Sequence, residues 1–206
     1  MDSSLSKYKS LRDPKKTPEP FTSKDVNPKK LMFVIQKHKA TALHYDFRLE
    51  VDKVMPSWAI PRGPCLDPAF KRLAMKTEDH PMDYRHFEGV IPEGEYGGGT
   101  VMVWDEGTYY PEIETAPGIR KQIKDKKEGE EIMEAGLKKG EIKFYLMGKK
   151  IKGSFALIKI KGFSKTKESW LLIKHKDEYT LENYDAKDFN FSAKSGKTLE
   201  EIASSS

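Results

Sequence analysis

The sequence predicts a mainly β fold, a small antiparallel β-barrel of about eight strands with one or two short helices. Two observations favour it: short apolar or alternating segments recur along the chain, and Gly and Pro clusters separate them. Because strands follow strands, the pattern does not fit alternating βαβ units. We predict a flexible basic N-terminal arm over residues 1–30 and a barrel domain over 31–206.

The composition is that of a water-soluble protein of 206 residues, 37% hydrophobic and 33% charged. No apolar run is long enough to cross a bilayer and no secretory signal begins the chain, so we expect a cytoplasmic protein. The lone Cys65 excludes an internal disulfide and a thiolate metal cage. A net charge of +5 favours an anionic partner such as nucleic acid. No extended apolar surface pattern indicates an interface, so we expect a monomer.

The predicted arm is rich in Lys, Ser and Pro and has few apolar residues, which favours a flexible solvated tail. Its basic side chains could also follow a phosphate backbone. They are Lys7, Lys9, Arg12, Lys15 and Lys16.

The barrel domain begins with an apolar strand at 31–36, and His38 lies at its end. On the next strand, His44, Asp46 and Arg48 are two residues apart and share one face, while apolar residues occupy the other. Two imidazoles and a carboxylate suit a divalent transition metal with open coordination positions. The Arg suits bidentate contact with phosphate or carboxylate. A solvated strand with a local charge cluster would give the same pattern.

A strand carrying Trp58 follows, then a Gly and Pro loop at 61–68 and a second strand at 72–77. The next turn, 78–84, is crowded with titratable groups and contains His80. Catalytic groups are frequent on loops that a rigid scaffold positions, so this turn is a candidate part of a site.

Five glycines lie between residues 89 and 99, ahead of a strand at 100–105. No Gly-Lys-Ser/Thr follows and the run opens a strand, so it is neither a P-loop nor a dinucleotide fingerprint. We predict a sharp turn or bulge at a barrel corner. Candidate outer carboxylates nearby are Glu88, Glu93 and Glu95.

The C-terminal half predicts an exposed loop over 112–130 and a short helix over 130–139 that Gly140 would cap. The apolar stripe of this helix indicates core packing. A three-stranded meander over 141–175 follows, and Thr198 begins a short helix with capping-box spacing.

Four motifs carry a resemblance to a known family: FVIQKHKATALHYDFRLE, SWAIPRGP, EDHPMDYRHFEG and IPEGEYGGGTVMVWDEGT. Together and in this order they resemble the 3′-phosphoesterase domain of bacterial DNA ligase D and its free-standing archaeal and bacterial relatives. The resemblance extends from about Lys7 to the TLEEIA segment. With no ligase or polymerase sequence attached, the chain resembles the free-standing form.

The resemblance implies that 31–206 is a phosphoesterase β-barrel with a manganese-dependent site. Such a protein removes a 3′-terminal ribonucleotide to leave a 3′-phosphate, then hydrolyses that phosphate to a 3′-hydroxyl. The implied setting is DNA break repair by non-homologous end joining at the nucleoid. The implied partners are DNA or DNA–RNA 3′ ends, a DNA ligase and other end-joining proteins.

The resemblance also assigns roles to residues on the matching motifs. It implies metal ligation by His38, His44 and Asp46, phosphate contacts by Arg48 and His80, and a contribution of Tyr84 to the phosphomonoesterase step. Secondary members of the site would be Gln36, Arg62, Arg72 and Glu78. Arg62 occupies a position that accepts Lys or Arg in the family.

Two other functions remain open. A non-haem Fe(II) oxygenase would use His44 and Asp46 with a distant third ligand such as His175. A non-catalytic nucleic-acid-binding barrel would stack bases on aromatic side chains. The candidates for stacking are Tyr84, Tyr96 and Trp104.

Overall fold

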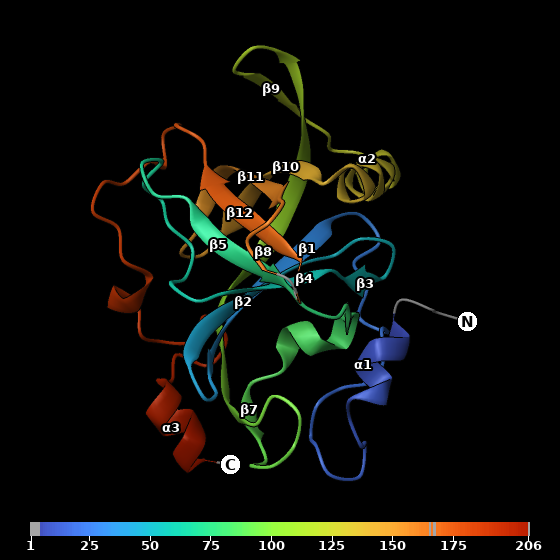
Figure 1. Ribbon diagram of the computed structural model, residues 1–206, viewed down its shortest axis with the longest axis vertical. Coiled ribbons are helices and arrows are strands. Elements are labelled where there is room, and N and C mark those ends of the chain that lie inside the picture. Colours follow the sequence, from blue (N-terminus) through green and yellow to red (C-terminus); the bar gives the residue numbers. More distant parts are fainter. Residues whose placement is uncertain (1–4, 165, 167, 206) are drawn as a thin grey trace.

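The computed structural model describes residues 5–164, 166 and 168–205, and they form a closed antiparallel barrel of eight strands (Figure 1). Around the barrel the order is β1, β2, β4, β5, β12, β11, β10 and β8, and β8 pairs with β1 to close it. The predicted fold class is confirmed. The barrel strands are β1 (Leu31–Lys39), β2 (Leu43–Leu49), β4 (Ser57–Ile60), β5 (Arg72–Lys76), β8 (Gly99–Ala116), β10 (Glu141–Gly148), β11 (Lys152–Ile160) and β12 (Ser169–Lys174).

Shorter elements surround the barrel. The remaining strands are β3 (Val54–Met55), β6 (His80–Pro81), β7 (Gly89–Ile91) and β9 (Ile119–Gln122). The helices are α1 (Ser6–Ser10), α2 (Lys126–Lys139) and α3 (Leu199–Ser204), with the 3₁₀ turns η2 (Met82–His86) and η3 (Ala186–Asp188). Within the described residues, no helix has the length and apolar character needed to span a membrane.

The barrel interior is a packed aromatic core. Phe33 and Ile35 of β1 point into the barrel, as do Tyr45, Phe47 and Leu49 of β2, the latter three as the alternation predicted. Phe47 contacts the rings of Trp58 and Phe144. Trp104 and Trp170 are also fully buried there. Because neighbouring residues of a strand face opposite sides, the even-numbered polar residues lie on the outer wall of the barrel.

A second layer covers part of this outer wall. The N-terminal segment with α1, the β3–β6 pair, η2 and β7 lie against the barrel below and beside β2 (Figure 1). Their apolar side chains form two small clusters with residues of the wall. One contains Tyr8, Tyr84, Phe87, Ile91 and Val101, and the other contains Val34, Met55, Met82 and Val103.

The predicted arm is therefore packed where the structure describes it, from residue 5 onward; residues 1–4 of the prediction lie outside the described residues. Tyr8 is fully buried and Leu5 nearly so. Composition does not predict this packing, because only two apolar residues, Leu5 and Tyr8, anchor the segment. The buried ion pairs of Arg12 hold the rest of this polar segment.

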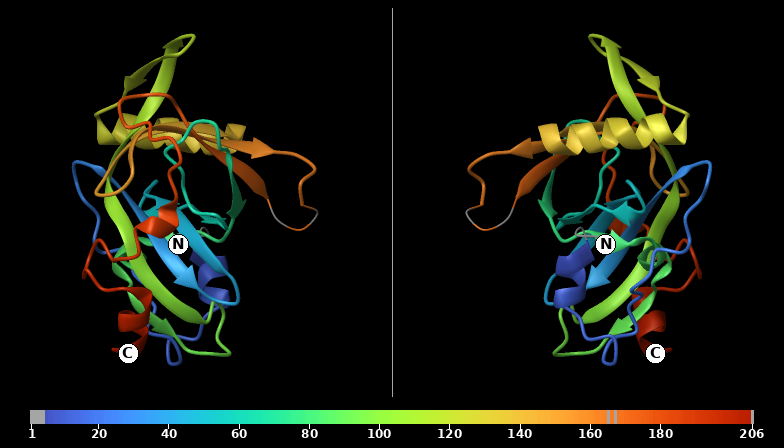
Figure 2. Two further views of the ribbon diagram at one scale, coloured as in Figure 1. Left: turned by 90° about the vertical axis from the view of Figure 1, so that its left-hand side faces the viewer. Right: turned by 90° about the vertical axis from the view of Figure 1, so that its right-hand side faces the viewer.

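The loop predicted over 112–130 is wrong. Strand β8 continues to Ala116, turns through Gly118 (φ +76°) and returns as β9, and this hairpin stands away from the barrel (Figure 2). Helix α2 then begins four residues earlier than predicted, where Asp125 accepts a hydrogen bond from the Glu128 amide. Both faces of the hairpin are largely exposed, so its strands lack the apolar alternation that reveals a strand.

The other C-terminal predictions are confirmed. Helix α2 ends at Gly140 in the left-handed conformation, and Met133 and Leu137 face the core. The meander is β10–β11–β12. Helix α3 has the capping box between Thr198 and Glu201.

Candidate functional site

The candidate metal ligands come from one hairpin. In the β1–β2 pair His38 lies opposite His44, Gln36 opposite Asp46, and Val34 opposite Arg48. Residues directly opposite on antiparallel strands have Cβ atoms about 5 Å apart on the same face. The hairpin register therefore places both imidazoles and the carboxylate together on the outer wall.

His38, His44 and Asp46 form what we call the ligand corner. His38 Nδ1 lies 3.6 Å from Asp46 Oδ2, and His44 Nε2 lies 3.6 Å from Asp46 Oδ1. One ligand atom from each residue lies within 4.8 Å of the other two. These separations are longer than hydrogen bonds. They suit three ligands at about 2.1 Å from a common cation.

The chemistry of the corner fits a divalent cation. His44 Nδ1 lies 2.9 Å from the Ala42 carbonyl, which places its proton there and leaves Nε2 as a ligand. His38 Nε2 is buried and has no hydrogen-bond partner among the described residues. Burial opposes the charge of Asp46, but Arg48 and the two imidazoles hold the pKa of its carboxyl well below the usual range. Mixed nitrogen and oxygen ligation of this kind suits Mn²⁺ and other first-row metals.

Arg48 joins the ligand corner to the rest of the site. Its guanidinium donates through Nη2 to Asp46 Oδ2 at 3.0 Å, through Nε to Gln36 Oε1 at 2.8 Å, and through Nη1 to His80 Nδ1 at 2.9 Å. Gln36 in turn donates to the Tyr84 carbonyl at 3.0 Å. A buried guanidinium held at three positions is a rigid cationic group at the metal ligands.

The environment of His80 favours its neutral imidazole. Burial lowers its pKa well below the usual value, and the positive charges of Arg48 and Arg12 lower it further. Its Nδ1 lies 2.9 Å from Arg48 Nη1 and 2.9 Å from the main-chain oxygen of Glu78. The guanidinium can only donate and the carbonyl can only accept, so the two contacts favour opposite tautomers.

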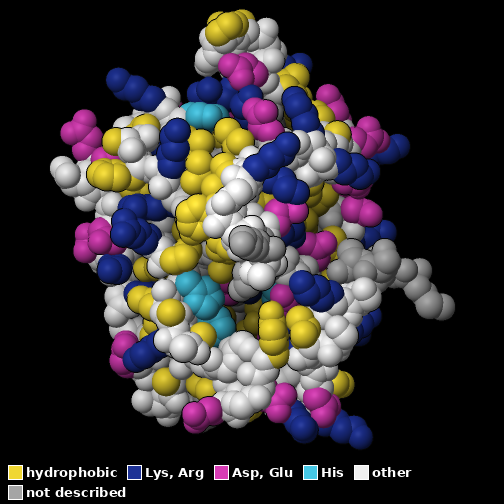
Figure 3. All heavy atoms as spheres, in the orientation of Figure 1, with side chains coloured by type: hydrophobic (Ala, Val, Ile, Leu, Met, Phe, Trp, Pro, Cys, Tyr) yellow, Lys and Arg dark blue, Asp and Glu magenta, His cyan; other side chains and the backbone are white. Residues whose placement is uncertain are grey.

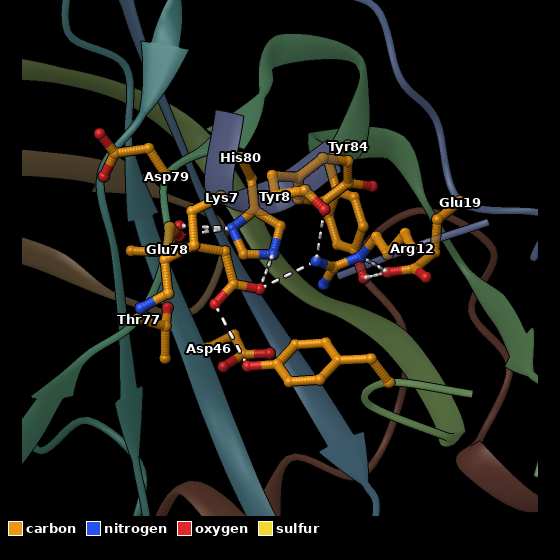
Figure 4. Close-up of polar contacts among 12 residues, drawn as sticks. Lys7, Tyr8, Arg12, Glu19, Asp46, Thr77, Glu78, Asp79, His80 and Tyr84 are labelled. Atoms are coloured by element: carbon orange, nitrogen blue, oxygen red, sulfur yellow. Dashed lines mark hydrogen bonds and ion pairs between the residues drawn. The ribbon is translucent and has the colours of Figure 1, made fainter. Parts of the chain in front are cut away.

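A second arginine comes from the N-terminal segment. Arg12 donates through Nε to Glu19 Oε1 at 2.8 Å and through Nη1 to Glu78 Oε1 at 3.0 Å, and all three side chains are buried (Figure 4). The Tyr84 hydroxyl donates to the same Glu19 oxygen at 2.9 Å. Burial and the charge of Glu19 raise the pKa of Tyr84, which stays a neutral donor. We call this set the arginine corner: Arg12, Glu19, Arg48, Glu78 and His80.

Both corners open on one cavity of about 440 Å³. Histidine side chains are visible below and to the left of the centre of the face in Figure 3, with apolar side chains beside them. The two corners form its ionic wall. The apolar part of the lining, which we call the apolar wall, consists of Ala40, Ala42, Leu43, Ala59, Pro61 and Met75.

The structure brings most of the predicted site residues together. Those that line the cavity are His38, His44, Asp46, Arg48, Glu78, His80 and Tyr84. Gln36 lies behind Arg48 as its support. Arg62, in an exposed turn after β4, and Arg72, at the start of β5, do not line it, so their roles stay predictions.

The candidate outer carboxylates are not part of the cavity lining either. Glu88 Oε2 instead accepts from the Val103 amide at 3.0 Å and from a serine hydroxyl, which is a structural role. Glu93 and Glu95 are exposed or half-exposed in the β7–β8 loop. His175 lies just beyond β12 and is not in the ligand group, so it is not the third ligand that the oxygenase alternative assigned to it; His38 lies in that position instead.

Sequence reasoning missed the contribution of the N-terminal segment. Arg12 was recognised only as a basic residue of a tail, and Glu19 and Tyr8 were not considered. The sequence offers one usable signal, the short spacing of Tyr8 and Arg12: Arg12 follows just after helix α1, and its guanidinium lies 4.0 Å from the centre of the Tyr8 ring.

The fold and the site define a small β-barrel protein with a candidate metal centre on the outer wall of its barrel. The chain belongs to the DNA Ligase D 3′-phosphoesterase domain family, whose model matches residues 36–159. The family inferred from the sequence motifs is therefore confirmed.

Curated relatives agree with this membership. The chain is similar to the multifunctional non-homologous end joining protein LigD of Pseudomonas aeruginosa, 45% identical over 84% of this chain and 19% of the relative. It is similar to the multifunctional non-homologous end joining DNA repair protein LigD of Mycobacterium tuberculosis, 41% identical over 84% of this chain and 20% of the relative. The Mycolicibacterium smegmatis protein LigD is 42% identical over 84% of the chain and 21% of its own length. The chain thus spans about a fifth of these relatives.

Proposed function

We propose that the protein is a manganese-dependent DNA 3′-end-healing phosphoesterase. It removes a 3′-terminal ribonucleotide to leave a 3′-phosphate, and then hydrolyses that phosphate to a 3′-hydroxyl. Its substrates are DNA or DNA–RNA 3′ ends, and it acts as a cytoplasmic monomer in break repair beside a DNA ligase and other end-joining proteins. Family membership supports the class of reaction.

One observation carries the proposal. The cavity sets three potential metal ligands beside Arg48, which donates to Asp46 at 3.0 Å, with Arg12 and His80 on the same ionic wall. Phosphoester hydrolysis needs cationic groups against the non-bridging oxygens and a position for water. Two buried guanidiniums beside the ligands match the several negatively charged oxygens of a phosphate, so this arrangement favours phosphoester chemistry.

His38, His44 and Asp46 would hold the cation. When bound, Mn²⁺ would offset negative charge on the phosphate and lower the pKa of a water molecule. Arg48 and Arg12 would bind the non-bridging oxygens, because each presents guanidinium donors to the cavity. Asp46 and Gln36 keep Arg48 oriented, and Glu19 and Glu78 keep Arg12 oriented.

In each step one water oxygen forms a bond to phosphorus and one ester bond breaks. The first step breaks the bond to the terminal nucleoside, and the second breaks the bond to the 3′ oxygen of the strand. The leaving oxygen takes a proton in both. His80 is placed to supply or hold that proton, because its Nδ1 lies 2.9 Å from Arg48 on the ionic wall. Burial and the charges of Arg48 and Arg12 lower its pKa, and a phosphate between the two guanidiniums would offset the part that is due to the charges.

The test is a 5′-labelled primer-template that ends in one ribonucleotide, incubated with and without Mn²⁺. We expect conversion to a 3′-phosphate and then to a 3′-hydroxyl end, dependent on the metal. An unchanged primer that still shifts on a native gel would replace the proposal with a nucleic-acid-binding module.

A further inference from the structure

Tyr96 offers an aromatic ring at the mouth of the cavity. Of the three aromatic residues considered for base stacking, Trp104 is fully buried inside the barrel and Tyr84 is 2% exposed. Tyr96 is 47% exposed and lines the cavity. Of the three, Tyr96 is therefore the one whose ring a ligand can reach.

The ring is held in place before any ligand binds. The Arg12 guanidinium carbon lies 5.1 Å from the centre of the Tyr96 ring and 4.0 Å from the centre of the Tyr8 ring. The Tyr96 hydroxyl donates to Glu78 Oε2 at 3.4 Å. A ring that is already oriented loses little freedom on binding, which favours its use as a platform.

The glycine run explains why the ring stands there. Gly97 adopts φ +77°, and a Cβ on it would lie 3.9 Å from His38 Cε1, so the loop rests on a candidate metal ligand. A Cβ on Gly98 would lie 2.9 Å from the Pro92 carbonyl, and one on Gly99 would overlap the Lys39 carbonyl. The loop is thus fitted to the end of β1, which sets the distance of Tyr96 from the ligand corner.

The walls of the cavity suit the two halves of a nucleotide. The ionic wall offers guanidiniums to a phosphate, whereas the apolar wall, with Leu43 39% exposed, suits the faces of a sugar and a base. Tyr96 lies beside Arg12 of the N-terminal segment. Met75 belongs to the same lining and shares the outer face of β5 and β12 with Leu73 and Leu171, which are partly exposed. A polymer strand could leave the cavity over these partly exposed apolar residues, which would place the terminal nucleoside at Tyr96.

We infer that Tyr96 is the stacking platform for the base of the 3′-terminal nucleoside, which the first step releases. The inference rests on the proposed function. A strand that ends in a 3′-phosphate has no such nucleoside, so its hydrolysis does not use the platform. Tyr96 is thus a specificity-determining residue for ribonucleotide removal.

The kinetic test compares Tyr96→Ala and Tyr96→Phe with the wild type on two primers, one ending in a ribonucleotide and one in a 3′-phosphate. Loss of a base-stacking ring should raise KM for the ribonucleotide primer about 10-fold. The rise should be at least fivefold greater than for the 3′-phosphate primer. Tyr96→Phe keeps the ring and should restore KM. Tyr179→Ala removes an exposed tyrosine outside the cavity lining and is the matched control.

Equal changes on the two primers, or Tyr96→Phe as harmful as Tyr96→Ala, would overturn the inference, because both point to a structural effect through Glu78. A wild-type protein that processes neither primer would instead count against the proposed function. If neither primer is processed, binding of a fluorescent primer still tests whether Tyr96 stacks on the terminal base. A primer with 2-aminopurine as its terminal base should lose fluorescence on binding His44→Ala protein, and should not do so with the His44→Ala, Tyr96→Ala double variant.

Discussion

The two corners of the site are built in different ways. The ligand corner comes from residues 38–46 of one hairpin, and its geometry follows from the β1–β2 register. The arginine corner joins residues far apart in the chain: Arg12 contacts Glu78 across 66 positions. It also depends on the N-terminal segment lying against the barrel.

This difference predicts that the ligand corner survives the loss of Arg12, the part of the arginine corner that comes from the N-terminal segment, although Arg48 links the two corners through Asp46. A hairpin within a closed barrel keeps its register when a covering segment is lost, because the pairing of β1 with β2 and β8 remains. The arginine corner has buried charges that must all be paired, so one deletion leaves its partners unsatisfied. Metal affinity should report on the first corner, and substrate affinity and stability on the second.

The largest effect is expected in the ligand corner. His44→Ala removes one of three ligands. Loss of a residue that only supports a ligand lowers metal affinity by up to about 100-fold. The Mn²⁺ affinity of His44→Ala, measured by calorimetry, should therefore fall by more than about 100-fold. Both esterase activities should be lost with it. His175→Ala removes a histidine that is outside the ligand group and serves as the control. Unchanged Mn²⁺ affinity in His44→Ala would show that the metal binds elsewhere.

Sequence alone could reach the ligand corner because its information is local. Alternation along β2 placed Tyr45, Phe47 and Leu49 in the core and left three polar residues on the other face. The alternation does not predict that other segments of the chain pack over this outer face. Those segments are held by a few contacts between residues far apart in the sequence, such as the contact between the rings of Tyr8 and Tyr84. Secondary roles for Arg62 and Arg72 came from motif resemblance and stay predictions.

The next largest effect is expected at Arg12. Arg12→Ala leaves the buried carboxylates of Glu19 and Glu78 without their guanidinium, so the free energy of unfolding should fall by about 3 kcal/mol. KM for a 3′-phosphate primer should rise as well. Mn²⁺ affinity should stay within about threefold of the wild type, since no ligand is touched. Urea unfolding, steady-state kinetics and calorimetry measure the three quantities.

Arg12→Lys is the matched variant. It keeps the charge but lacks the planar fork that reaches both carboxylates, so its losses should be smaller than those of Arg12→Ala. A large fall in Mn²⁺ affinity in a folded Arg12→Lys protein would contradict the survival of the ligand corner without Arg12.

A smaller effect is expected at Tyr84, which supports the arginine corner through one hydrogen bond to Glu19. Tyr84→Phe removes that bond, and we expect about a 10-fold fall in 3′-phosphate hydrolysis with a smaller fall in ribonucleotide removal. The monoester carries more charge and relies more on the orientation of Arg12. Rates on the two primers measure the difference, and equal losses in both steps would exclude this division of roles.

The smallest effect is expected outside both corners, at His175. Its Nδ1 lies 2.8 Å from the Ser154 hydroxyl, which donates to Glu112. Burial and, after it, the positive charges of neighbouring side chains together lower the pKa of His175 to about 4. Those charged neighbours are Arg120, Lys143 and Lys174, with Glu114 opposing them.

The sign of the pH effect follows from this direction. Between pH 6.5 and 4 the unfolded chain binds a proton at His175 that the folded protein does not, so stability present above pH 6.5 is lost as the pH falls. For a half-buried group we expect about 1 kcal/mol after allowing for solvent screening. Between pH 7 and pH 4.5 the wild type should therefore lose about 1 kcal/mol more unfolding free energy than His175→Gln, which has no imidazole to protonate. A constant difference would mean that His175 titrates normally, and Mn²⁺ affinity at pH 7 should be the same in both proteins.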